Sequence, residues 1–229
     1  MYENLIKRIF TSILLLSLLI IVNFSYQFIF IGSILILGLV VCIEANNMFI
    51  KLVSSHLLKK NILFKKSNLK FLILNLLTFF YIFFIFCNFS YEIHSSESPT
   101  FFLYIISICF FTDIGGYIIG KTFGGKKLIK ISPKKTISGT IGSFIFSIIP
   151  LIIFSNFTHL ELDMNKLNIL FSLLISLISQ IGDLCISYLK RKANVKDTGK
   201  LLPCHGGVLD RIDGIIFALP FSYFLLSFI

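Results

Sequence analysis

The residues best suited to chemistry lie near the C-terminus, in a short segment between two long apolar stretches. Residues 190–213 combine six cations with three carboxylates, a histidine and the paired glycines Gly206 and Gly207. Glycines let backbone amides approach an anion closely, and carboxylates beside so many cations suit a pocket shared by a metal ion and a polyphosphate. Cations alone would instead fit acidic lipid headgroups. That alternative does not account for the carboxylates.

A second polar pattern precedes this segment, inside an apolar stretch. Asp183 is followed at i+4, i+7 and i+8 by Ser187, Lys190 and Arg191, which places all four on one face of a helix. A carboxylate, a hydroxyl and two cations in one stripe could hold a divalent metal and the phosphates it neutralises. The alternative is a structural contact of Asp183 with Lys190 or Ser187.

Two further acidic residues lie in or beside apolar stretches. Asp113 is followed by Gly116 and Gly120, which clear one helix face, either for a ligand or for close packing against another helix. Glu44 ends another apolar stretch. We expect Glu44 to be solvated at the membrane interface.

The elements that carry these residues are predicted to be transmembrane helices. The chain has 229 residues, of which 56% are hydrophobic and 14% charged, whereas a soluble domain carries about 25% charged residues. Continuous apolar runs of about 17–25 residues favour helices over a β-barrel. We predict an all-α polytopic membrane protein with about seven spans: Ile9–Phe24, Tyr26–Ile43, Lys70–Ser90, Phe101–Gly120, Ile137–Phe157, Leu167–Leu189 and Asp213–Ile229.

The distribution of positive charge predicts the orientation. Of the 21 Lys and Arg residues, all but Lys166 lie in the N-terminus, in the loops after the second, fourth and sixth predicted spans, or at their margins. Positively charged loops stay in the cytoplasm, so the N-terminus and the active site, at one end of the C-terminal helices, are expected on the cytoplasmic side. The outer halves of the spans are almost purely apolar, which disfavours a transporter.

The polar segment closely resembles the signature of the phosphatidate cytidylyltransferases, also called CDP-diacylglycerol synthases. The matching residues are Ser187, Leu189, Lys190, Arg191, Lys196, Asp197, Gly199, Leu202, Pro203, His205, Gly206, Gly207, Val208, Asp210, Arg211, Ile212 and Asp213. Residues 113–124 and 131–139 resemble two further motifs of that family. Ile186, Ser138 and Cys204 depart from its usual residues.

The resemblance covers roughly residues 100–229, so it divides the chain into a catalytic transmembrane region, 100–229, and three N-terminal transmembrane helices, 1–99. It implies that a cytidylyl group passes from CTP to phosphatidate in phospholipid biosynthesis, giving CDP-diacylglycerol and pyrophosphate. It implies Mg²⁺, with room for a second cation, held by Asp183 and Asp210. Alternatives are a CTP-dependent polyprenol or phytol kinase and an ion or solute transporter.

The resemblance also implies roles for individual residues. The expected catalytic residues are Asp183, Asp210, Lys190, Arg191, Lys196, Asp197, His205, Arg211 and Asp213. The expected substrate-binding residues are Asp113, Lys121, Ser132, Lys135, Thr136, Ser187, Gly206 and Gly207. His205 is expected to position phosphate, with general-base catalysis as the alternative. The implied setting is a bacterial inner (plasma) membrane, with CTP, phosphatidate and the bilayer as partners, no nucleic acid, and a homodimer as an option.

Overall fold

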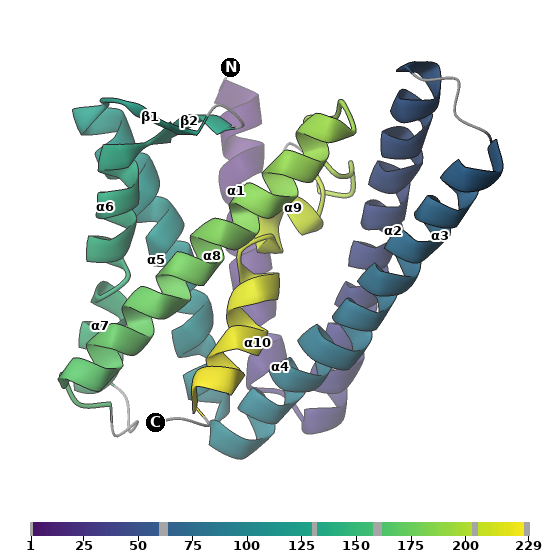
Figure 1. Ribbon diagram of the computed structural model, residues 1–229. Coiled ribbons are helices and arrows are strands. Elements are labelled where there is room, and N and C mark those ends of the chain that lie inside the picture. The colour runs from purple at the N-terminus through teal and green to yellow at the C-terminus, as the bar shows by residue number, and fades with distance from the viewer. Residues whose placement is uncertain (1, 60–63, 130–131, 158–161, 203–205, 227–229) are drawn as a thin grey trace. The chain divides into compact units, whose positions relative to one another are not determined.

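The computed structural model describes the backbone of the chain except for residues 1, 60–63, 130–131, 158–161, 203–205 and 227–229, and the side chains except for 1–10, 55–68, 129–134, 157–161, 203–205 and 227–229. The described chain is predominantly helical (Figure 1). The helices are α1 (Tyr2–Asn23), α2 (Gln27–Lys59), α3 (Phe64–Phe80), α4 (Asn88–Glu92), α5 (Pro99–Phe123), α6 (Ile137–Phe146), α7 (Ile149–Phe157), α8 (Lys166–Lys192), α9 (Leu209–Ile212) and α10 (Ile215–Leu226). Two π-helical segments, Tyr81–Cys87 and Ile93–Glu97, flank α4.

Helices long and apolar enough to cross a membrane make up much of the described chain. Five qualify: Gln27–Ser54, Leu69–Glu97, Pro99–Phe123, Ile137–Asn156 and Lys166–Lys192. Two further apolar helical stretches, Thr11–Asn23 within α1 and Ile215–Leu226, lie among the described residues. The prediction of a polytopic helical membrane protein therefore agrees with the structure.

A small β-ribbon between α5 and α6 is a local departure from the all-α prediction. Strand β1 (Lys127–Ile129) pairs antiparallel with β2 (Ser132–Thr136), with Lys127 opposite Thr136. Thr136 then ends the ribbon and begins α6, because its hydroxyl accepts the N–H of Gly139 at 3.1 Å, as a helix N-cap does. The ribbon thus sets where α6 starts.

Two predicted spans differ in detail from the observed helices. The span expected over 137–157 is present as a candidate span but consists of two helices, α6 and α7, with a turn between them, where Pro150 in the first turn of α7 cannot donate to Phe146. The helix α2, whose predicted span ends at Ile43, continues to Lys59. Ala45, Met48 and Phe49 are buried, so the buried face of α2 runs on past the acidic residue that had suggested its end.

The chain forms two compact units. The first comprises residues 1–91 and 189–212, and the second residues 92–188 and 213–229. The family resemblance had divided the chain into residues 1–99 and 100–229. The compact units differ from this division, because residues 189–212 pack with the N-terminal helices.

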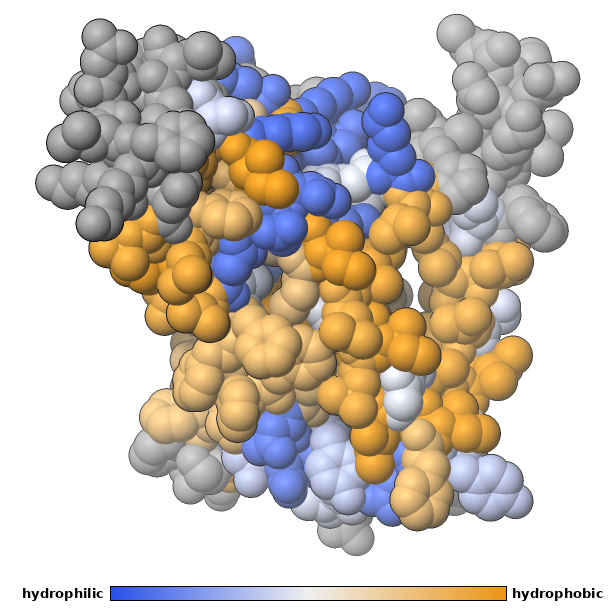
Figure 2. Space-filling model, turned by 90° about the vertical axis from the view of Figure 1, so that its right-hand side faces the viewer, coloured by the Kyte–Doolittle hydropathy of each residue, from blue (hydrophilic) through white to orange (hydrophobic). Residues whose placement is uncertain are grey.

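In the first unit, α2 and α3 lie side by side as a helical hairpin (Figure 1). Their outward faces carry exposed large apolar side chains, including Ile36 and Leu39 of α2 and Leu76 and Leu77 of α3. On the face drawn in Figure 2, apolar side chains form a broad zone with hydrophilic groups above and below it. Such exposed apolar surface suits contact with lipid tails.

In the second unit, α5 packs against α6 through glycines. A Cβ atom on Gly115 would lie 2.5 Å from the carbonyl oxygen of Gly142, and one on Gly116 would lie 2.6 Å from Ser143 Oγ. The face that follows Asp113 is therefore a helix-packing face. Buried hydroxyls link α5 to α8, because Thr112 donates to Ser176 at 2.9 Å.

Candidate active site

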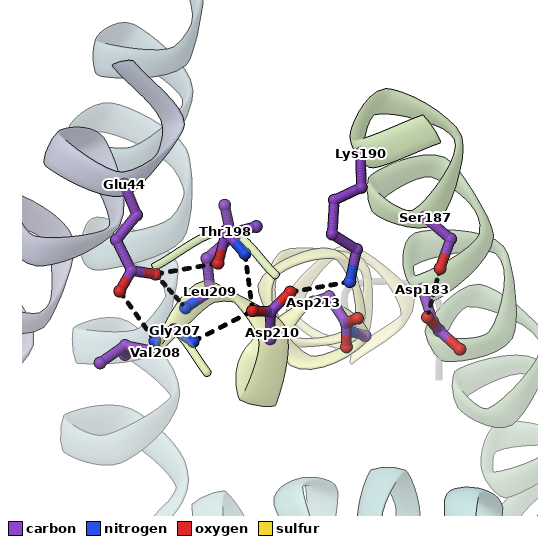
Figure 3. Close-up of polar contacts among 11 residues, drawn as sticks. Glu44, Asp183, Ser187, Lys190, Thr198, Gly207, Val208, Leu209, Asp210 and Asp213 are labelled. Atoms are coloured by element: carbon purple, nitrogen blue, oxygen red, sulfur yellow. Dashed lines mark hydrogen bonds and ion pairs between the residues drawn. The ribbon is translucent and has the colours of Figure 1, made fainter. Parts of the chain in front are cut away.

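One candidate cluster surrounds the carboxylate of Asp210 on α9, in the first unit. Its Oδ1 accepts the Lys190 ammonium at 2.7 Å, and its Oδ2 accepts the backbone N–H groups of Thr198 at 2.8 Å and Gly207 at 3.0 Å (Figure 3). The side chain is only 7% exposed. Burial alone would raise the pKa of Asp210, but the hydrogen bonds and the Lys190 charge outweigh it and hold the pKa below its usual value.

Glu44 of α2 holds the same loop from another side, a role that the apolar pattern around it did not predict. The residue is only 2% exposed, so the expectation that it is solvated at the membrane interface was wrong. Its Oε1 accepts the N–H of Val208 at 3.0 Å, and its Oε2 accepts the N–H of Leu209 at 2.9 Å and the hydroxyl of Thr198 at 3.1 Å (Figure 3). Its partners lie 154–165 residues away in the chain. The hydropathy of the residues around Glu44 carries no information about such distant partners.

Glycines let the loop close around these carboxylates. Gly206 has φ of +86°, a region that favours glycine, and a Cβ there would lie 3.1 Å from Asp210 Oδ2 and 3.2 Å from Asp197 Cβ. Gly199 and Gly207 approach the Glu44 side chain too closely for a Cβ. The amide of Gly207, predicted to face a phosphate, donates to Asp210 in this structure.

Another candidate cluster surrounds Asp183 of α8, in the second unit. Its Oδ2 lies 2.5 Å from Lys135 Nζ, and its Oδ1 accepts the Ser187 hydroxyl at 3.2 Å. The carboxyl group of Asp213 also lies within hydrogen-bonding reach of Asp183. The structural contact of Asp183 with Ser187, given above as part of the alternative, is present, whereas Lys190 forms its ion pair with Asp210.

Asp213 follows α9 in the chain and precedes α10. It is 9% exposed, and its Oδ1 accepts the N–H of Gly214 at 2.9 Å. The predicted last span begins at Ile215, not at Asp213, so Asp210 and Asp213 do not share the start of one long helix. Close packing of α8 against this turn holds Asp213 near Asp183: a Cβ on Gly182 would lie 2.8 Å from the Asp213 carbonyl oxygen.

The remaining predicted residues have varied surroundings. Exposed side chains are those of Asp113, Lys121, Arg191, Lys196, Asp197 and Arg211. Lys121 lies 5.5 Å from the centroid of the Tyr117 ring. The structure places Ser132 in β2, but its side chain and all of His205 lie outside the described residues.

Two of the departures from the family pattern have structural roles. Ser138 hydrogen-bonds to the hydroxyl of Thr136 at 3.0 Å and donates to the carbonyl oxygen of Gly124, so it ties the start of α6 to the end of α5. Ile186 is 8% exposed and belongs to the apolar core. Cys204 lies outside the described residues.

The donor chemistry near Asp183 fits a magnesium ion. Among the described side chains, no group of three or more His, Cys, Asp or Glu gathers in a metal-binding arrangement. Mg²⁺ commonly uses only one or two carboxylates and takes its other ligands from water and substrate phosphates. Asp183 with Asp213 provides adjacent carboxylates of this kind. Oδ1 of Asp210 already accepts the Lys190 ammonium. A metal ion bound by this oxygen would therefore displace Lys190 or share the oxygen with it.

Comparison with known proteins identifies the class of this chain. It matches the model of the cytidylyltransferase family over residues 7–229. The chain therefore belongs to the cytidylyltransferase family, and the match includes the N-terminal helices as well as the signature segment.

The chain is also similar to individual curated proteins. The chain is 41% identical over 129 residues to the phosphatidate cytidylyltransferase of Bacillus subtilis (strain 168), covering 56% of this chain and 48% of that protein. It is 43% identical over 141 residues to the phosphatidate cytidylyltransferase of Staphylococcus aureus (strain COL), covering 60% and 53%. The chain thus spans about half the length of the curated relatives it matches.

Proposed function

We propose that this protein is a phosphatidate cytidylyltransferase that transfers CMP from CTP to phosphatidate. The observation that carries the proposal is the hydrogen-bonded cluster around Asp210 in a member of the cytidylyltransferase family. In it, the signature residues Lys190 and Gly207 each contact Asp210 directly. The relatives named above support phosphatidate as the acceptor.

In the proposed reaction a phosphate oxygen of phosphatidate attacks the α-phosphorus of CTP. A new P–O–P bond forms, the bond between the α- and β-phosphates breaks, and pyrophosphate leaves with the electron pair. Two polyanions must meet, so catalysis depends on positioning and on stabilisation of charge. The exposed cations Arg191, Lys196 and Arg211 are proposed to neutralise the phosphates of CTP and phosphatidate. Asp197 is proposed to orient these cations.

Asp183 and Asp210 are the proposed metal ligands, and Asp213 contributes a further carboxyl beside Asp183. Mg²⁺ would supply positive charge to the triphosphate and its leaving group. Lys135 contacts Asp183, so we propose that it reaches a substrate phosphate when Asp183 binds the metal. Gly206 and Gly207 are proposed to shape the loop rather than to hold the phosphate through the Gly207 amide.

His205 is proposed to position phosphate, because a phosphate monoester dianion is already a nucleophile near neutral pH and needs no base. The pH–rate profile tests this role. We expect the profile of His205→Asn to keep the wild-type shape, and loss of one limb would identify His205 as a base.

The proposed setting is a bacterial plasma membrane crossed seven times, with the N-terminus and the active site in the cytoplasm and two copies in a homodimer. The positive-inside rule supports the orientation. Cysteine labelling from each side of intact cells, and chemical crosslinking in membranes, test the topology and the dimer.

The activity itself is tested in membranes that contain the protein, supplied with phosphatidate, Mg²⁺ and CTP labelled at the α-phosphate. We expect labelled CDP-lipid and release of pyrophosphate. Release of CDP with a phosphorylated lipid alcohol would identify a kinase instead. Asp183→Asn and Asp210→Asn should each abolish the reaction, while Asp163→Asn, the same change at an exposed residue, should not. Substantial activity in either of the first two would refute the assigned roles.

A further inference from the structure

We infer that Glu44 is a positioning residue for the reaction: it fixes the loop and helix that present Asp210 and Arg211. The inference rests on the proposed function and assigns a catalytic-site role to a residue of the N-terminal helices. Glu44 lies on α2, about midway along the described helix. It touches none of the substrates in the mechanism proposed above.

Both oxygens of Glu44 are committed to the loop between α8 and α9. Oε1 accepts from Val208, and Oε2 accepts from Leu209 and from the Thr198 hydroxyl, at distances of 2.9–3.1 Å. Val208 immediately precedes α9 and Leu209 is its first residue, so the carboxylate binds the N–H groups that begin this helix. Asp210 and Arg211 follow directly.

Thr198 connects the two carboxylates. Its hydroxyl donates to Glu44 at 3.1 Å, while its backbone N–H donates to Asp210 at 2.8 Å. The amides of Gly207, Val208 and Leu209, three in succession, donate to Asp210, Glu44 and Glu44 respectively. Displacement of Glu44 would therefore release two of the three amides and one of the two Thr198 contacts. The position of Asp210 would then depend on its own hydrogen bonds alone.

The chemistry of the contact requires a carboxylate. A buried carboxylate is costly unless hydrogen bonds satisfy it, and Glu44 at 2% exposure receives three. Glutamine has nearly the same shape but offers only one acceptor oxygen. In Glu44→Gln, either Val208 or Leu209 must direct its N–H at an NH₂ group. The change thus disturbs the loop while leaving the size of the side chain nearly unchanged.

The experiment compares purified full-length wild type, Glu44→Gln and Glu97→Gln in detergent. Glu97 is exposed, so Glu97→Gln is the same chemical change away from the loop. Limited trypsin digestion reports loop opening at the exposed residues Lys196 and Lys200 and global opening at the exposed residues Lys126 and Lys127. The rates are obtained by mass spectrometry of the fragments, and KM and kcat are measured in parallel with CTP and phosphatidate.

For Glu44→Gln we expect cleavage at Lys196 and Lys200 to accelerate about tenfold, with cleavage at Lys126 and Lys127 unchanged. A loop that is closed less often lowers the apparent affinity for CTP by the same factor. We therefore expect the KM for CTP to rise about tenfold with kcat within about twofold of wild type, and saturating CTP to protect the loop from trypsin. Glu97→Gln should behave as wild type.

Thr198→Val provides an independent check, because it removes one donor to Glu44 and keeps the Thr198 backbone contact to Asp210. We expect Thr198→Val to raise loop cleavage less than Glu44→Gln does. We expect the double variant to exceed Glu44→Gln by less than the effect of Thr198→Val alone, since the residues share one interaction. Full additivity would overturn the direct coupling.

The outcomes separate this inference from the proposed function. Wild-type loop cleavage and KM in Glu44→Gln would overturn the inference. So would a loss of kcat at unchanged KM with faster cleavage at all four lysines, since that indicates global destabilisation. If the wild-type protein makes no CDP-lipid, the proposed function fails, and with it the catalytic role of Glu44, while the trypsin rates still report whether Glu44 holds the loop.

Discussion

Substitution of Gly182 by alanine tests the packing that brings Asp183 and Asp213 together. A Cβ on Gly182 would lie 2.6 Å from Phe217 Cδ2 and 2.8 Å from the Asp213 carbonyl oxygen, whereas carbon atoms pack at about 3.5–4.0 Å. The ring of Phe217 and the backbone of Asp213 must therefore move by roughly 1 Å. Overpacking of this kind costs about 1–3 kcal/mol.

We expect Gly182→Ala to lower the melting temperature in detergent by several degrees, at about 2–4 °C for each kcal/mol. A thiol-reactive dye that labels the buried residues Cys87 and Cys109 as the protein unfolds measures this change. CDP-lipid formation should also fall at temperatures where the variant is still folded, because the carboxyl groups of Asp183 and Asp213 separate.

The matched control is Gly32→Ala, also within a helix, where no atom lies within 4 Å of the added Cβ. Alanine is favoured over glycine in a helix by about 1 kcal/mol, so this variant should be as stable as wild type or more so. If Gly182→Ala melts at the wild-type temperature and retains full activity, the close approach of α8 to the turn before α10 does not position the two carboxyl groups.

Two further predictions concern charged groups. Replacement of Lys135 by methionine removes the cation beside Asp183 and should lower the rate of CDP-lipid formation about tenfold or more, the loss typical for one charge-stabilising group; an unchanged rate would contradict its proposed role. Because the folded-state pKa of Asp210 is lowered, its charged form contributes stability at neutral pH, and this contribution disappears as the pH falls below the ordinary value of about 3.9. Thermal melts followed by circular dichroism between pH 6 and pH 3 should therefore show a melting temperature that depends less on pH in Asp210→Asn than in wild type. Parallel curves of melting temperature against pH would contradict this stabilising role of the Asp210 carboxylate.

The sequence predicted most of the helices correctly, because a long apolar run has few alternatives to a helix in a membrane. The predictions failed where the sequence pattern of an element is short. Strands of three and five residues, such as Lys127–Ile129 and Ser132–Thr136, are too brief to show a period of two. The break before α7 could have been found from Pro150, which cannot complete the helical hydrogen-bond pattern.

The candidate site was predicted where its contacts are local. Spacing along one helix correctly placed Ser187 beside Asp183. It could not show that Lys190 binds Asp210, since that contact depends on how the intervening loop folds. Glu44 appeared to end an apolar helix, yet apolar residues at Met48 and Phe49 continue its buried face. That continuation was the available signal that the carboxylate is internal.

The contacts of Glu44 have a consequence for exchanging parts between relatives. A chimera that joins the C-terminal region of this chain to the N-terminal helices of another protein would retain the whole signature segment. It would lose the acceptor for Val208, Leu209 and the Thr198 hydroxyl unless the donor protein supplies a carboxylate at the position of Glu44. Such grafts should therefore succeed or fail according to one residue in a helix outside the motif, and restoring glutamate there should recover a failed graft.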